Sequence, residues 1–244
     1  MESYQHFISL GFFCSTASEL EKVGLRDTSS PFDWLITDFK GLIQCMENKF
    51  EGILDYENLS QYKDNPSYYV DEKYDFHFYH DFSGYTSLEE QLPSVLEKYK
   101  KRIEKFYINI QEPTLFFRYI KDNNELNYIE KNYEKIISII KKNNKHNNLI
   151  LISNDDIASS TLFIYIVEKD KNDIVARNFL RKNLNLKKYL CSNIYNMEKR
   201  NNNLQIYKKK YKYIKIKNFY NSFYLKIKNK FKKKYIHKTL YVKK

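Results

Sequence analysis

The chain has 244 residues, of which 42% are hydrophobic and 30% are charged, so it can form one sizeable core and is not disordered throughout. A formal net charge of +12 by itself suggests a nucleic acid or an anionic membrane as partner. The charge is unevenly distributed, because residues 199–244 contain 17 basic residues and no acidic one, which leaves 25 basic against 30 acidic residues in 1–198. The basicity therefore belongs to a tail, and the body is mildly acidic.

The three cysteines are widely spaced and odd in number, and they fit no zinc pattern. Neither a disulfide framework nor a structural metal site is expected, and no cofactor is predicted. Cys45 and Cys191 are interpreted as small buried hydrophobic residues. The amino terminus lacks the basic residues of a signal peptide, and no apolar run approaches the roughly 18 residues of a membrane span. We therefore expect a cytoplasmic protein without a transmembrane segment.

The first elements form a strand, a turn and a helix. Residues 6–10 are a short apolar run typical of a strand, and the helical pattern that follows ends at Gly24, a residue suited to the left-handed conformation. Thr16 and Glu19 have the spacing of a capping box. Cys14 lies in the turn between strand and helix.

Further along the chain, strands alternate with helices. The elements expected in order are a helix at 39–50, an alternating strand at 74–82, a helix at 87–108 with a break near Pro93, a strand at 114–120, a helix at 125–143, and strands at 148–153 and 161–167. This order predicts an α/β fold with a mostly parallel sheet flanked by helices. We place this domain at 1–180 and a basic, partly ordered C-terminal extension at 181–244, where 211–217 is the clearest strand-like alternation.

Ligands of parallel α/β sheets gather at the carboxyl ends of the strands. Each predicted strand is followed there by polar residues: Cys14 after the first, His80 and Asp81 at the second, Arg118 and Asp122 at the third, and Asn154 and Asp155 at the fourth. The sequence therefore predicts a set of Cys, His and Asn or Asp side chains on one edge.

This set suits nucleophilic catalysis. A helix N-terminus and a neighbouring imidazolium favour the thiolate form of a cysteine, and His80 is the candidate general base. Backbone N–H groups from Gly11 to Ser15 are the candidate oxyanion site. Other interpretations remain open: Cys14 and His80 as core residues, His77 as the rival base or a structural histidine, and Arg118 either paired with a carboxylate or bound to an anionic group.

The residues also resemble a known family. Residues 7–35 read FISLGFFCSTASELEKVGLRDTSSPFDWL and resemble the opening signature of the putative papain-like cysteine peptidase family, with its Ser-Leu-Gly-x-x-Cys block and its Gly-Leu-Arg and Ser-x-Pro-Phe-Asp-Trp block. FHFYHDF at 76–82, KYKKRIEKF at 98–106 and LFFR at 115–118 are similar to later elements of that family. The resemblance reaches about residue 155.

The resemblance implies roles for individual residues. It places the nucleophile at Cys14 and the base at His80, and makes Asp33 a candidate orienting or substrate-binding residue. The third member of the triad stays open among Asp33, Asp81, Asn154 and Asp155. The expected substrate-binding positions are Gly11, Arg26, Trp34 and Arg118.

Three functions follow as alternatives. The first is a thiol hydrolase acting on a peptide or amide. The second is an acyltransferase or esterase that uses Cys14 and His80 on an acylated glycan, because the strand–turn–helix unit is also similar in outline to SGNH-type esterases and capsule-biosynthesis acyltransferases. The third is a noncatalytic binding module. The body does not look like a nucleic-acid-binding fold, and the basic tail is either a weak contact for anionic surfaces or a solvated extension.

Overall fold

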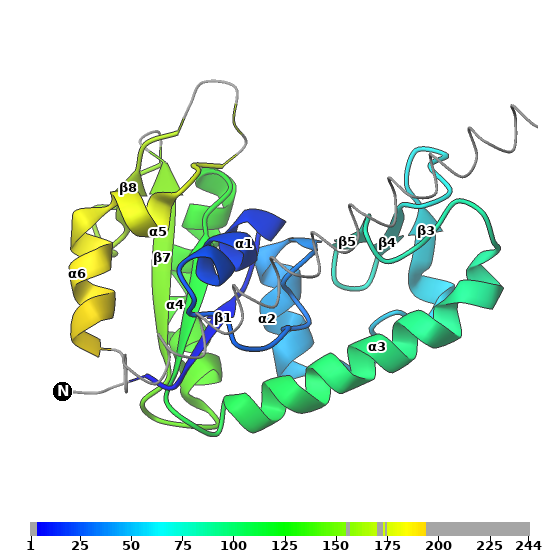
Figure 1. Ribbon diagram of the computed structural model, residues 1–244, viewed down its shortest axis with the longest axis horizontal. Coiled ribbons are helices and arrows are strands. Elements are labelled where there is room, and N and C mark those ends of the chain that lie inside the picture. The colour runs from blue at the N-terminus through cyan, green and yellow to red at the C-terminus, as the bar shows by residue number, and fades with distance from the viewer. Residues whose placement is uncertain (1–3, 155–156, 170–172, 174, 194–244) are drawn as a thin grey trace, which may run out of the picture. The chain divides into compact units, whose positions relative to one another are not determined.

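A computed structural model describes residues 4–154, 157–169, 173 and 175–193. Four parallel strands form its main sheet in the order β1-β6-β7-β8. Their bounds are His6–Ser9 for β1, Thr114–Tyr119 for β6, Asn148–Asn154 for β7 and Tyr165–Val167 for β8. The expected α/β fold with a parallel sheet flanked by helices is confirmed (Figure 1).

Six α-helices accompany the strands in the described part of the chain. They are α1 (Cys14–Lys22), α2 (Phe39–Glu47), α3 (Leu88–Asn109), α4 (Asn123–Lys141), α5 (Phe179–Lys182) and α6 (Leu184–Asn193). Alternate residues of the parallel strands point to opposite faces. Phe7 and Phe117 pack with α1, α5 and α6, whereas Ile8 and Phe116 pack with α2, α3 and α4. None of these helices is long and apolar enough to cross a bilayer.

A second, antiparallel sheet has the strand order β2-β5-β4-β3. Its strands are β2 (Ile36–Thr37), β3 (Leu59–Gln61), β4 (Tyr69–Asp71) and β5 (Phe76–Phe78), with a 3-10 turn at Tyr56–Asn58 before β3. The strand expected at 74–82 therefore does not belong to the parallel sheet. Its alternation explains this, because Phe76 and Phe78 are buried while His77 is partly exposed, as in a sheet with one solvated face.

Helix α3 extends from the antiparallel sheet to the parallel one (Figure 1). Ser87 and Glu90 form a capping box at its start, and the helix runs without interruption through Pro93, where a break was expected. Pro93 is exposed, so the carbonyl group that loses its backbone partner can be solvated. Phe106 of α3 lies in one hydrophobic cluster with Phe76 and Phe116, and this cluster joins the two sheets.

The boundary expected at residue 180 stays a prediction. Helix α6 carries the described structure to Asn193. The strand-like pattern at 211–217 and the rest of the basic extension beyond 193 lie outside the described residues.

Candidate active site

The turn that leads to Cys14 is fixed by Arg118. This side chain lies in β6 and is fully buried. It donates to the carbonyl oxygen of Leu10 at 2.7 Å and to the hydroxyl and carbonyl oxygens of Thr37 at 2.8 and 2.9 Å. The Glu125 carboxylate accepts its other two hydrogen bonds, at 2.6 and 2.8 Å. All five N–H groups of the guanidinium are thus used within the protein.

Of the two interpretations of Arg118, the structure shows the pairing with a carboxylate, that of Glu125. Every N–H group of the guanidinium already has an acceptor within the protein. Gly11 belongs to the same cluster. Its φ is +82°, and a Cβ atom there would lie 2.4 Å from the Thr37 hydroxyl oxygen and 3.1 Å from the Arg118 guanidinium. Only glycine fits this close approach. Gly11 and Arg118 thus both hold the turn, and the substrate-binding role expected for them stays a prediction.

Cys14 is the first residue of α1 and lies at the carboxyl edge of the parallel sheet. The N-cap residue Phe13 offers no side-chain cap, so the positive end of the helix dipole is uncompensated beside the thiol. The predicted Thr16–Glu19 capping box does not form. The helix begins at Cys14, two residues before Thr16, and the Thr16 hydroxyl donates to the Gly11 carbonyl oxygen at 3.1 Å. Gly24 has the expected positive φ, +75°.

Cys14 is partly exposed and lines an open cavity of about 450 Å³. The cavity lies between α1 and the segment before α5, and its other lining residues are Phe13, Ser15, Ser18, Glu19, Lys22, Asp173, Val175, Ala176 and Arg177. The other described cysteine side chain, Cys45, is fully buried, and burial raises the pKa of its thiol. Accessibility therefore distinguishes Cys14 from Cys45.

Tyr79 contacts the Cys14 thiol. Its hydroxyl donates to Sγ at 3.5 Å, and its ring lies parallel to that of Phe13 with centroids 6.2 Å apart. Burial, followed by the hydrogen bond to Cys14, raises the pKa of Tyr79. The phenol thus stays protonated at neutral pH and can donate to the sulfur.

His80 also contacts Tyr79. The centroids of the two rings are 4.0 Å apart, and the His80 side chain is exposed. Among the described residues, no hydrogen bond joins Cys14 to a histidine. Cys14 and His80 thus both contact Tyr79. Cys14 follows a strand of the parallel sheet, whereas His80 follows a strand of the antiparallel one.

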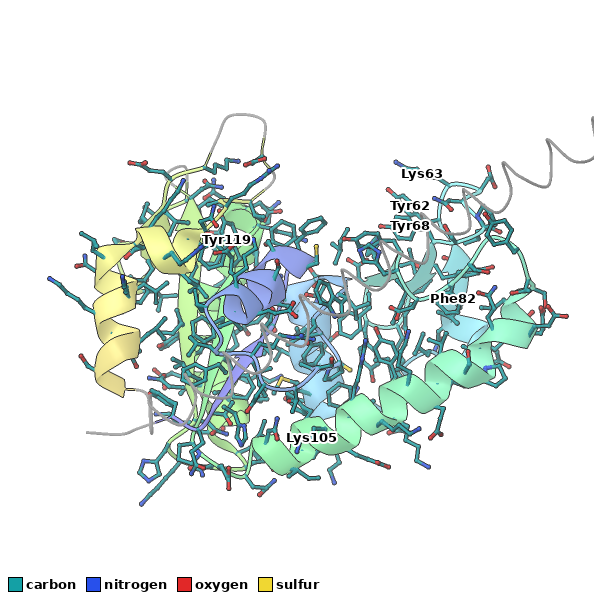
Figure 2. The ribbon with its side chains drawn as sticks, in the orientation of Figure 1. Tyr62, Lys63, Tyr68, Phe82, Lys105 and Tyr119 are labelled. Atoms are coloured by element: carbon teal, nitrogen blue, oxygen red, sulfur yellow. The ribbon has the colours of Figure 1, made fainter. Side chains whose placement is uncertain are left out.

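The rival base His77 has partners at both ring nitrogens. Nδ1 is 2.8 Å from the Tyr68 hydroxyl and Nε2 is 3.0 Å from an Asp75 carboxylate oxygen. Tyr68 also packs against Tyr62, with ring centroids 4.4 Å apart, beside the antiparallel sheet (Figure 2). These contacts hold His77 in that sheet.

The signature loop is held by its own side chains. Asp33 is buried and accepts hydrogen bonds at 2.8 Å from both Arg26 Nε and the Ser30 backbone N–H. Arg26 also lies 5.4 Å from the centroid of the Trp34 ring. Burial raises the pKa of Asp33 against the opposing effect of Arg26. The three signature residues Arg26, Asp33 and Trp34 thus stabilise one another.

The other polar residues expected at the strand ends have different surroundings. Asp81 pairs with Lys98 and accepts from the Tyr99 hydroxyl at 3.1 Å, both on α3. Asp122 caps α4 through the Glu125 backbone N–H. Asn154 is buried at the end of β7, and Asp155 lies outside the described residues. No carboxylate in the described ranges hydrogen-bonds His80, so the third member stays a prediction.

Sequence reasoning missed two side chains at this site. The alternation at 74–82 puts Tyr79 and His80 on opposite faces of the expected strand, and nothing in it indicates that the Tyr79 hydroxyl reaches Cys14 from the second sheet. Glu19 was interpreted as a helix cap, but it lines the cavity beside Cys14.

The fold is that of an α/β protein with a partly exposed thiol at the N-terminus of its first helix. The chain belongs to the putative papain-like cysteine peptidase family (DUF1796), whose family model matches residues 5–154. It is also 25% identical over 221 residues to the uncharacterized protein R408 of Acanthamoeba polyphaga mimivirus, a match that covers 76% of this chain and 97% of that protein. No solved structure matches the chain.

Proposed function

We propose that the protein is a thiol hydrolase that cleaves an amide or peptide bond with Cys14 as nucleophile. The observation that carries the proposal is the position of Cys14 at the uncapped N-terminus of α1, where it is accessible from a cavity. The helix dipole favours the thiolate, and the cavity gives an acyl group room beside it. The name of the family agrees with this chemistry.

The reaction has two halves. His80 takes the thiol proton, and Sγ attacks the carbonyl carbon of the substrate to form a tetrahedral intermediate. The imidazolium of His80 then protonates the leaving nitrogen, the C–N bond breaks and a thioester remains. Water, deprotonated by His80, attacks the thioester, releases the carboxylic acid and restores the thiol.

The first turn of α1 supports the negative charge of each intermediate. The N–H groups of a first helical turn have no acceptor within their own helix. Those of Cys14 and Ser15 are the proposed donors to the oxyanion. Tyr79 supports the proposal as a donor to the sulfur, since its hydroxyl already faces Sγ.

Labelling with iodoacetamide tests both assignments, because alkylation needs the thiolate but no knowledge of the substrate. Rates at pH 7 are measured on the Cys14 peptide by mass spectrometry for wild type, His80→Ala and His77→Ala, and Cys14→Ala supplies the background. We expect rapid labelling of wild type, about tenfold slower labelling of His80→Ala if the lost partner contributes about 1.4 kcal/mol to the thiolate, and little change in His77→Ala.

Two results would contradict these assignments. Equal rates for wild type and His80→Ala would remove His80 as the base, and a selective loss in His77→Ala would transfer that role to His77. A wild-type Cys14 no more reactive than an ordinary peptide thiol would refute the proposed nucleophile.

A further inference from the structure

Two residues that line the cavity beside Cys14 have buried polar atoms without a hydrogen-bond partner among the described residues. Glu19 is 1% exposed, and one of its carboxylate oxygens, Oε1, accepts from Lys22 Nζ at 2.8 Å. The other oxygen, Oε2, is buried and has no hydrogen-bond partner within the part of the chain that the structure describes. The hydroxyl oxygen of Ser15 is buried and unpartnered in the same way, and both residues line the cavity.

An unpartnered buried carboxylate oxygen is costly, because it has lost its water and gained nothing in exchange. The charged side chains around it do not supply the missing donor. Lys22 contacts the other oxygen of Glu19, and Arg177 is paired with Asp173 at 2.8 Å. The cavity therefore offers an acceptor without a donor, next to the nucleophile.

We propose that Glu19 Oε2 binds an amino group of the substrate, close to the bond that Cys14 attacks. This assignment rests on the proposed function and gives its substrate a chemical class, an acyl compound that carries a protonated primary amine. Glu19 is five residues after Cys14, about 7.5 Å along the helix axis, and its side chain inclines towards the N-terminus of α1. Both Cys14 and Glu19 line the same cavity, so one ligand can contact the two residues.

The ligand must donate a hydrogen bond, because Oε2 can only accept. An anionic group is not favoured there, since the cations beside Glu19 already have carboxylate partners. A cation without N–H groups would gain the charge interaction but would leave the acceptor unsatisfied. Charge and hydrogen bonding can therefore be separated by experiment.

Three methanethiosulfonates of similar size make this separation. The aminoethyl reagent carries a cation with N–H groups, the trimethylammonium-ethyl reagent carries a cation without them, and the propyl reagent is neutral. Rates of Cys14 modification are measured by mass spectrometry and divided by the rate of each reagent with 2-mercaptoethanol. The variants are Glu19→Gln and, as matched control, Glu21→Gln, which makes the same charge change on α1 at a residue that does not line the cavity.

We expect the aminoethyl reagent to react with wild-type Cys14 about tenfold faster than the other two, as one charge-assisted hydrogen bond would give. Glu19→Gln should reduce this preference to within about twofold, and Glu21→Gln should keep it. The inference is overturned if the trimethylammonium reagent shares the preference, if all three normalised rates agree, or if Glu21→Gln loses as much as Glu19→Gln. If Cys14 reacts with none of the reagents, the proposed function fails as well, so the two failures are distinguishable.

Discussion

Arg118 shows how a single buried residue can fix the turn that carries a candidate site. Its guanidinium joins the Leu10 carbonyl, Thr37 and Glu125, which come from three separate stretches of the chain. A buried cation is tolerated only when it is fully paired. The position of the Cys14 turn therefore depends on a carboxylate more than 100 residues away in sequence.

Glu125→Gln should destabilise the fold by about 3 to 5 kcal/mol, because it leaves the Arg118 charge buried without its counter-ion. Urea unfolding followed by circular dichroism measures this change. The matched control is Glu97→Gln, which breaks the exposed pair with Lys101 and should cost about 0.5 kcal/mol or less. Similar losses in the two variants would show that Arg118 does not depend on Glu125.

His6 links β1 to two other parts of the protein and is a pH-dependent contact. Its ring nitrogens lie 3.4 Å from Asp27 and 2.9 Å from Glu112. Burial lowers the pKa of His6, but the two carboxylates outweigh it, so the net direction is upward from 6.5. A raised pKa means that the folded state binds the proton more tightly than the unfolded state does.

The contribution of His6 to stability should therefore be complete below about pH 6 and should disappear as the pH rises through the raised pKa of the folded state. The difference in unfolding free energy between wild type and His6→Gln, measured by urea titration at pH 5.5 and pH 8.5, isolates this contribution from the other histidines. We expect a larger difference at pH 5.5. A difference that stays constant or grows with pH would contradict the sign of the shift.

At the scale of elements, α2 approaches the antiparallel sheet through a glycine. A Cβ atom at Gly41 would lie 1.9 Å from the Tyr74 carbonyl oxygen, which is a backbone atom. At an exposed helical site Gly→Ala is stabilising by roughly 1 kcal/mol. Here the side chain would push the helix away from the turn before β5.

Gly41→Ala should thus destabilise the protein, by about 1 to 3 kcal/mol as for other overpacked positions. Thermal unfolding measures the effect. Gly84→Ala is the comparison, because its Cβ would meet only the Pro66 side chain, at 3.0 Å, and the residue is exposed. If Gly41→Ala were as stable as wild type, the close packing of α2 against Tyr74 would be refuted.

Local patterns predicted single elements better than they predicted partners. The apolar strand before Gly11 and the left-handed conformation of Gly24 could be identified because their signals lie within a few residues. The strand at β5 was also identified, but its sheet was not, because strand pairing depends on contacts far apart in sequence. Its alternation was the available signal, since a strand covered on both faces would be apolar throughout.

At the scale of the whole molecule, the candidate site combines residues from both sheets. Cys14 follows a strand of the parallel sheet, whereas Tyr79 and His80 follow a strand of the antiparallel one. The sequence indicated Cys14 as the candidate nucleophile, since a strand–Gly–x–x–Cys–helix unit is local. It did not indicate the Tyr79 contact or the unpartnered Glu19 oxygen, because both depend on how distant segments pack around α1.

The hydrophobic cluster that joins the two sheets has a consequence for how a substrate arrives. Phe76 and Phe78 of one sheet share a continuous core with Ile8 and Phe116 of the other, so opening a path between the sheets would expose apolar side chains to water at about 25 cal/mol for each Å². The open cavity along α1 avoids that cost. A substrate of the proposed hydrolase is therefore expected to approach Cys14 through this cavity, past Lys22, while the packed sheets stay closed.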